Sequence, residues 1–570
     1  MKKRSGTHRP SGCFRNPRLR ALCRTALFLC LWEVPLLCGA PPAGPIVSTT
    51  IDFLDYCFYK TDAETGYFTE AQYEEVIRKV AEAGFAKVYL RVDVCGVTLY
   101  PTTAGKQYAG DGRDPGSTYL VNTLAKYDPA AKTIEFGHKY GLQVWAWDTL
   151  FDDEATMVWT GDKDDGRKER FGEYPLKDPF LVQNPQFQWE LDPRVDARQR
   201  ALADLPGRNE PVTAIRITSD TRRKCRVAAG MFDIFVSDDN RTYRKYEGGQ
   251  RLGGTDTKPP VLLLDGLRIA EPYIKLVFGK NWPGDNSFTV SGDPESFVEL
   301  QYAGKWHKAI ADYRAQNNPP EQGGFDFVAG RFAWDFKNRA MGIGKFAPEL
   351  RRHYGIAEVA YPEVRAHKLA KLRELAAYKF DGFAYSIRTH TLGSGPGNYG
   401  YNDVTRDAFK KRYGKDIRSE EFDREAWLNL RAEAVNSYLV EAGKLLHPRP
   451  LYMDFPRQEK GAPYIRSYGG VPFQAEAWVR DKAVAGIRML GFAGDKPIAP
   501  PFKGSEHVRL IRFVDNWSVP PPDGFRANLR RWLADPALHE IEFYETLLYT
   551  PKPEYLAIVR EEIARSKKAP

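Results

Sequence analysis

The segment VYLRVDVCG at residues 88–96 sets the pattern that the rest of the chain repeats. Its apolar positions alternate as in a β-strand, and it ends in polar side chains that include Arg91 and Asp93. The preceding segment, 69–85, has apolar residues at helical spacing and ends near Gly84. A helix that runs directly into a strand is typical of a β-α-β unit with parallel strands.

Seven further segments alternate in the same way, and most end in charged or hydrogen-bonding residues. They are residues 45–59, 142–153, 380–391, 450–456, 486–494, 508–517 and 539–545. Helical patterns precede three of them, at residues 118–141, 363–380 and 424–447. Eight such strands predict an α/β fold, a closed (β/α)₈ TIM barrel, whose active site lies at the C-terminal ends of its strands.

The helix-strand alternation breaks between about Asp192 and Tyr313, where short alternating strands follow one another with turns but without helices. This pattern predicts an antiparallel β-sandwich at residues 192–315, inserted after the third barrel strand. The barrel would then consist of residues 44–190 and 320–570.

The positive charge of the chain is concentrated at its start. Residues 1–40 hold eight Lys or Arg and one Glu, a net +7, so that only +2 of the formal +9 remains for the rest. An apolar run at 26–38 follows, too short to span a bilayer, and it predicts a signal peptide of residues 1–40 and export to the periplasm or the exterior. We expect no membrane span after cleavage and no nucleic-acid partner, since no recognition motif for nucleic acid occurs.

Outside the leader the chain has three cysteines, Cys57, Cys95 and Cys225. Three cysteines cannot all pair within one chain, and free buried thiols are the prediction, with a Cys57–Cys95 bridge as the alternative. No metal site and no cofactor is expected. Metalloprotease, serine-hydrolase, nucleotide-binding and dehydrogenase motifs are absent from their required strand-turn-helix settings.

Two parts of the chain resemble known families. Residues 232–248, FDIFVSDDNRTYRKYEG, and 272–278, PYIKLVF, resemble a discoidin-like module, which implies a galactose-binding-like sandwich. Within it, residues 238–241 most simply form a hairpin turn and Tyr243 packs.

Residues 178–192, 355–386 and 400–417 resemble the secreted bacterial glycoside-hydrolase-like family 10 group. The resemblance implies a TIM barrel that acts on carbohydrate. In that group the fourth strand ends in acidic residues, whereas this chain has Ala384 and Ser386 at the corresponding positions. The catalytic residues of that group therefore do not carry over to these two positions, whereas the expected fold is unaffected.

Strand alternation selects the side chains that point into the barrel. Phe383, Tyr385 and Ile387 would face the helices, and Arg388 and His390 would face inward. Asp454 and Glu542 are the preferred catalytic pair, with Asp148 as an alternate acid. The predicted substrate-binding residues are Arg91, Asp93, Trp147, Arg388, His390, Tyr452, Asp515, Trp517, Tyr544 and Glu545.

These residues predict a glycoside hydrolase in which one carboxyl group donates a proton and the other acts as nucleophile or base. The substrate would be a polysaccharide or oligosaccharide, and the charge of Arg388, His390 and Arg91 favours an anionic sugar. The alternative is a non-catalytic carbohydrate-binding barrel, which Ala384 and Ser386 support. Arginine pairing of every acid at the rim would favour this alternative, because such pairs also serve structure alone.

Overall fold

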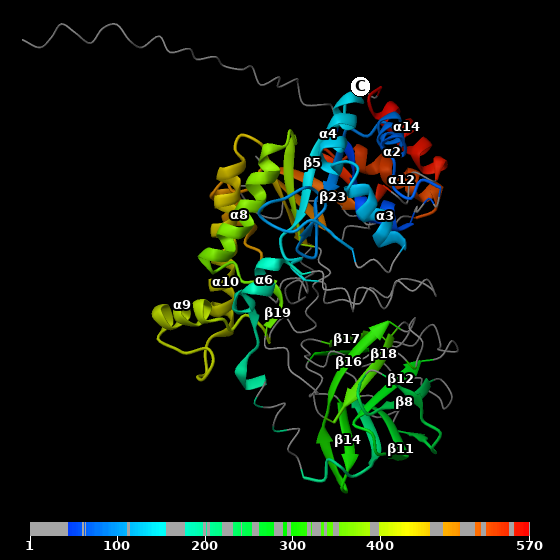
Figure 1. The fold of residues 1–570 in the computed structure, drawn as a ribbon, viewed down its shortest axis with the longest axis vertical. Helices are drawn as coiled ribbons and strands as arrows, with labels where there is room; N and C mark the ends of the chain where they lie inside the picture. The colour runs from blue at the N-terminus through cyan, green and yellow to red at the C-terminus, as the bar shows by residue number, and fades with distance from the viewer. Residues whose placement is uncertain are drawn as a thin grey trace, which may run out of the picture. The chain divides into compact units, whose positions relative to one another are not determined.

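In the computed structural model the eight predicted strands close into one parallel barrel, in the order β1-β2-β5-β20-β21-β22-β23-β24 (Figure 1). Their bounds are β1 Ile46–Ile51, β2 Lys87–Arg91, β5 Gln143–Thr149, β20 Gly382–Ser386, β21 Leu451–Pro456, β22 Gly486–Leu490, β23 Arg509–Val514 and β24 Glu540–Phe543. The barrel closes where Ser48 of β1 pairs with Glu542 of β24. The predicted fold class is therefore confirmed.

The structure describes residues 44–568, with internal gaps. The residues between 44 and 568 that it leaves undescribed are 60, 61, 63, 111–114, 155–176, 196, 198–200, 202–205, 219–231, 241, 254–260, 279–288, 293–297, 316–320, 322–331, 336–338, 346–352, 388–397, 457–470, 491–507, 515–519 and 547–551.

Helices connect the barrel strands and cover them. They are α1 Phe53–Tyr59, α2 Glu70–Glu82, α3 Pro115–Leu124, α4 Pro129–Lys139, α6 Pro179–Gln183, α8 Pro362–Ala377, α9 Asp403–Tyr413, α10 Arg424–Leu446, α11 Ala475–Arg480, α12 Pro522–Leu533 and α14 Pro553–Ser566. Helix α2 begins at a capping box, in which Thr69 accepts from the Gln72 backbone and the Gln72 side chain bonds back to Thr69. It ends before Gly84, whose φ of 88° suits glycine.

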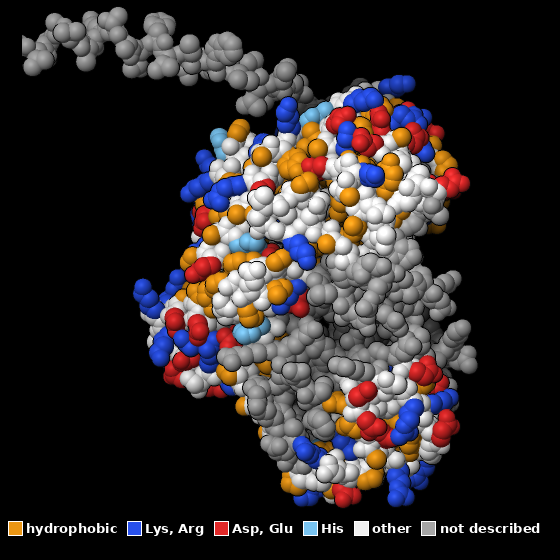
Figure 2. All heavy atoms as spheres, viewed as in Figure 1, with side chains coloured by type: hydrophobic (Ala, Val, Ile, Leu, Met, Phe, Trp, Pro, Cys, Tyr) orange, Lys and Arg blue, Asp and Glu red, His pale blue; other side chains and the backbone are white. Residues whose placement is uncertain are grey.

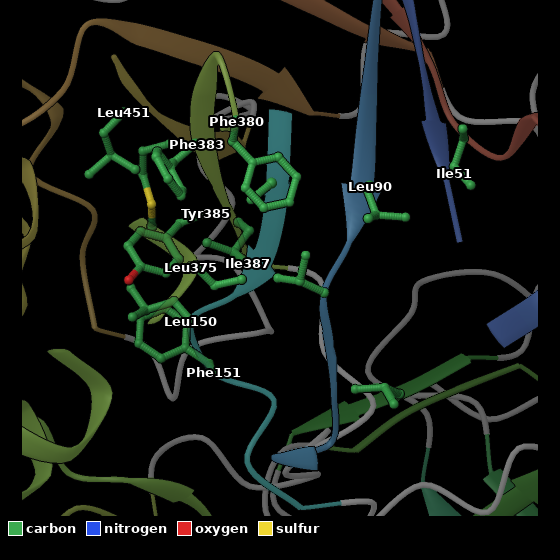
Figure 3. Packing of buried hydrophobic residues seen from close by; sticks show 14 of the residues in the cluster. Ile51, Leu90, Leu150, Phe151, Leu375, Phe380, Phe383, Tyr385, Ile387 and Leu451 are labelled. Atoms are coloured by element: carbon green, nitrogen blue, oxygen red, sulfur yellow. The ribbon is translucent and has the colours of Figure 1, made fainter. Parts of the chain in front are cut away.

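The two faces of each barrel strand have different roles. Phe383, Tyr385 and Ile387 lie in the large hydrophobic core beneath the helices, together with Leu375 of α8, as the alternation predicts (Figure 3). A second, smaller cluster fills part of the barrel interior. Its members are Tyr89, Trp145, Trp147, Ala384, Tyr452, Ile511, Phe513 and Tyr544. The interior is thus a packed core that also contains charged side chains.

The inserted region forms two five-stranded antiparallel sheets that are separate from the barrel sheet, in the orders β10-β11-β7-β14-β15 and β16-β18-β12-β8-β9. The strands are β7 Val212–Thr218, β8 Phe232–Ser237, β9 Arg244–Lys245, β10 Arg251–Gly253, β11 Val261–Ile269, β12 Tyr273–Phe278, β14 Val298–Tyr302, β15 Lys305–Lys308, β16 Ile310–Ala315 and β18 Arg339–Gly344. Strand β18 lies between β16 and β12, so the sandwich runs past residue 315, where the sequence pattern placed its end.

Three short two-stranded sheets complete the described structure. They pair β3 Asp93–Val94 with β4 Val97–Thr98, β6 Gln188–Glu190 with β19 His353–Ala357, and β13 Thr289–Gly292 with β17 Phe332–Asp335.

In the sandwich, Asn240 has a φ of 60° and Thr242 N donates to Asp239 Oδ1. Asp239 and Asn240 lie in the predicted turn at residues 238–241, of which Arg241 lies outside the described residues, and Tyr243 is buried.

Cys57 and Cys95 are free and buried, as predicted, and Cys225 lies outside the described residues.

None of the helices in the described part of the chain is both long and apolar enough to cross a membrane. The predicted leader, residues 1–40, also lies outside the described residues. On the face shown in Figure 2, basic and acidic side chains are interspersed.

Gly382 at the start of β20 offers a test of the interior packing. A Cβ atom at this position would lie 2.6 Å from three atoms of the Trp145 ring, so Gly382→Ala must displace a buried indole. We expect a loss of about 1–3 kcal/mol in the free energy of unfolding, the usual effect of overpacking. Urea denaturation measures it, with Gly249→Ala as the control, because that position has no neighbour within 4 Å. Equal stability of the two variants would contradict the packing described here.

Candidate functional site

Arg488 of β22 joins the two predicted catalytic acids inside the barrel. Its Nη1 atom forms an ion pair with Asp454 Oδ1 at 2.8 Å, and its Nε donates to Glu542 Oε2 at 2.7 Å. Its Nη2 also donates to Glu542 Oε1, so the contact with Glu542 is bidentate. All three side chains are fully buried, with 0% exposure.

The surroundings of the two acids differ. Asp454 Oδ2 accepts hydrogen bonds from Ser386 Oγ at 2.8 Å and from the Ile387 backbone N–H at 3.2 Å. Burial raises the pKa of Glu542 to about 7, although Arg488 opposes the shift. Ser386, which stands where the family resemblance implies an acid, is therefore a hydrogen-bond donor to Asp454.

A second ionic group lies toward the N-terminal ends of the strands. Lys87 Nζ is 2.5 Å from Glu540 Oε2, and Glu540 Oε1 accepts from Ser48 Oγ at 2.5 Å and from Tyr89 Oη at 2.8 Å. Tyr452, predicted to bind substrate, lies at this level, with its ring centroid 4.9 Å from Lys87 Nζ. Polar residues at this end of a TIM barrel usually serve stability.

A third ionic group is built on Arg91 at the C-terminal end of β2. Arg91 Nη1 lies 2.7 Å from Asp52 Oδ2, its Nη2 lies 3.0 Å from Asp152 Oδ2, and its Nε donates to the Asp93 carbonyl oxygen at 3.0 Å. The guanidinium also lies over the ring of Trp147, with Cζ 5.5 Å from the centroid. Arg91 therefore holds two carboxylates in place beside an indole.

Trp147 and Tyr544, both predicted to bind substrate, lie together in the interior, with their rings 5.9 Å apart in an edge-to-face arrangement. Glu545 follows directly after β24 and is partly exposed. Its φ is 57°, and its backbone N–H donates to Thr50 Oγ1 at 2.7 Å. Both Tyr544 and Glu545 are thus at the end of the barrel where function is expected.

Two predicted residues lie on the other side of the barrel wall. Trp145 and Trp147 fill the interior, so Asp148 projects from the opposite face of β5 with Val144 and Ala146. Asp93 belongs to the short hairpin beyond β2, and its Oδ2 is 2.6 Å from Lys371 Nζ on α8. Burial raises the pKa of Asp93. Neither carboxyl group lies with Asp454 and Glu542. Asp148 has the parity of the outward residues of β5, and Asp93 lies beyond the end of β2, so both side chains point toward the helices.

Four predicted residues, Arg388, His390, Asp515 and Trp517, lie outside the described residues. Arg488, Asp52 and Asp152 were not among the predicted site residues. Arg488 stands in an inward position of GIRML and Asp52 directly follows the first strand, so the alternation rule applied to every strand would have found both. Within the described ranges, no group of three or more His, Cys, Asp or Glu side chains is arranged to hold a metal ion.

No family model and no curated protein sequence matches this chain. Among solved structures, the chain is similar to the β-galactosidase from the psychrophilic Marinomonas ef1, with 8% identity and a TM-score of 0.36. That match covers 88% of this chain and 54% of the β-galactosidase, so the chain spans about half of its length. The catalytic domain of β-amylase from Paenibacillus polymyxa is similar with 7% identity and a TM-score of 0.39, over 93% of this chain and 100% of that domain. These are distant likenesses to glycoside-hydrolase structures.

The pKa of Glu542 predicts a pH dependence of stability. In the folded state it is about 7, above the ordinary value of 4.5, so the folded protein binds this proton more tightly than the unfolded chain does. The contribution of Glu542 to stability is therefore lost as the pH rises from about 4.5 through about 7, by about 3 kcal/mol at most.

Urea unfolding of the wild type and of Glu542→Gln at pH 5, 6, 7 and 8 measures this effect. The amide does not titrate, so the wild type should lose stability relative to the variant across this range. A constant difference between the two proteins would contradict the raised pKa.

Proposed function

We propose that the protein is an exported glycoside hydrolase that cleaves a polysaccharide inside the C-terminal mouth of its barrel. The observation that carries the proposal is the pair of carboxyl groups on β21 and β24, which face one interior and have different surroundings. Glycoside hydrolysis needs two such groups, one protonated and one charged, on the two sides of the scissile bond.

In this proposal Glu542 donates the proton to the leaving oxygen, because its pKa of about 7 leaves it protonated in much of the population near neutral pH. Asp454 acts as nucleophile or as the base that activates water. The cation of Arg488 and two hydrogen bonds stabilise its negative charge.

The substrate proposal is a complex polysaccharide. A preference for an anionic sugar rests on Arg388 and His390, which lie outside the described residues, and remains a prediction. Export rests on the basic, then apolar, sequence before residue 41.

A second function, a non-catalytic carbohydrate-binding barrel, is favoured by one observation. Both preferred acids share Arg488, and their side chains are 0% exposed. Buried carboxylates paired with arginine also occur as structural elements, and their presence alone does not require catalysis. Ala384 and Ser386 stand where the resembled family has acidic residues, and this also favours the second function.

Amide substitutions separate the two functions. Asp454→Asn and Glu542→Gln should each lower kcat on the cleaved polysaccharide by about a thousandfold, because each removes a group that acts in the transition state. Release of reducing ends across a polysaccharide panel measures the activity. Glu540→Gln is the matched control, since Glu540 lies on the same face of β24, two residues before Glu542 and nearer the N-terminal ends of the strands, and it should retain activity.

Binding without cleavage by the wild type would favour the second function. Cleavage that survives both amide substitutions but is lost in Asp148→Asn would move the acid to the third strand. Folding of each variant is checked by circular dichroism, so that a loss of activity is read only from folded protein.

A further inference from the structure

In the described part of the chain, three buried polar atoms near the C-terminal end of the barrel have no hydrogen-bond partner. They are Trp147 Nε1, Asp52 Oδ1 and Thr149 Oγ1, and their residues are 2%, 3% and 4% exposed. Leaving such a group unsatisfied in a folded protein is costly, because it has lost its hydrogen bonds to bulk water. A set of them in one place therefore indicates a site that a polar ligand completes.

The three residues are close to one another. Arg91 connects Asp52 and Trp147, because its Nη1 is 2.7 Å from Asp52 Oδ2 and its Cζ is 5.5 Å from the centre of the Trp147 ring. Thr149 is two residues beyond Trp147 on the same face of β5, which separates their Cα atoms by about 7 Å.

At the N-terminal ends of the strands, the carboxylate described above has its hydrogen bonds satisfied. There, both oxygens of Glu540 have partners, namely Ser48, Tyr89 and Lys87. The unsatisfied interior groups named above are instead at the end where TIM barrels bind their substrates.

We propose that Asp52, Trp147 and Thr149 form a subsite for one neutral, hydroxyl-bearing sugar ring. Asp52 Oδ1 accepts a hydrogen bond from a sugar hydroxyl, Trp147 Nε1 donates to a sugar oxygen, and Thr149 Oγ1 can do either. This inference rests on the proposed function for the carbohydrate nature of the ligand, and it assigns binding residues that the sequence analysis did not identify, apart from Trp147.

The charge of the subsite favours a neutral sugar over a uronic acid. Among the described residues, the charged group that would face the sugar is the Asp52 carboxylate, and its cation, Arg91, also pairs with Asp152. A sugar carboxylate would meet a carboxylate whose neighbouring cation is already paired, and like charges at this distance repel. Arg91 is a positioning residue here, since it fixes Oδ2 of Asp52 and leaves Oδ1 available.

Isothermal titration calorimetry on the full chain tests the subsite. The probes are neutral gluco-, galacto-, manno- and xylo-oligosaccharides, an oligogalacturonate and a chitosan oligomer. Thr149→Val and Asp52→Asn should each raise Kd for the neutral probe that binds by about tenfold or more, the loss of one hydrogen bond.

Asp481→Asn is the control. It also replaces a carboxylate by an amide, but Asp481 directly follows α11 and pairs with Arg480, away from the subsite. Its Kd should change by less than about twofold. Thr149→Val should also keep the thermal unfolding midpoint of the wild type or raise it, because the hydroxyl that it removes has no partner in the folded protein.

The outcomes separate this inference from the proposed function. Wild-type affinity in both Thr149→Val and Asp52→Asn would overturn the subsite, whether or not the protein cleaves the probe. Binding of the oligogalacturonate alone would overturn the neutral class. Binding that depends on Asp52 and Thr149, without release of reducing ends, would support the subsite and contradict the hydrolase.

Discussion

The buried guanidinium of Arg488 is the interaction on which the centre of the barrel depends. It neutralises a carboxylate from β21, the strand next to β22, and a carboxylate from β24, which lies one strand further on. Each carboxylate would be costly to bury alone, and removing the arginine would leave both uncompensated. One side chain thus permits two acids to face the interior, and it also fixes where their oxygens lie.

The barrel itself could be predicted from the sequence, because strand alternation and helical spacing report burial directly. Seven of the eight strands lie within the predicted segments, and β2 begins one residue before its segment. Phe383, Tyr385 and Ile387 face the helices as expected. The end of the sandwich was harder to predict. Strand β18 pairs with β12 and β16, and pairing between distant segments leaves no local signal in one sequence.

The candidate site was only partly predictable for a related reason. Parity along a strand correctly gave Asp454 and Glu542 as inward residues, but it required consistent use: with Trp145 and Trp147 inside, Asp148 had to lie outside. The missing partner was Arg488. Contacts across the barrel decide which of the inward residues form pairs. The fold gives the order of the strands, but it does not give the positions of their side chains.

The interior also links stability to chemistry. Two carboxyl groups, Asp454 and Glu542, share the one guanidinium of Arg488. Burial is easier when one carboxyl group keeps its proton, and the raised pKa of Glu542 is the expected response. The same excess of acids that lowers stability at high pH supplies a carboxylic acid at neutral pH.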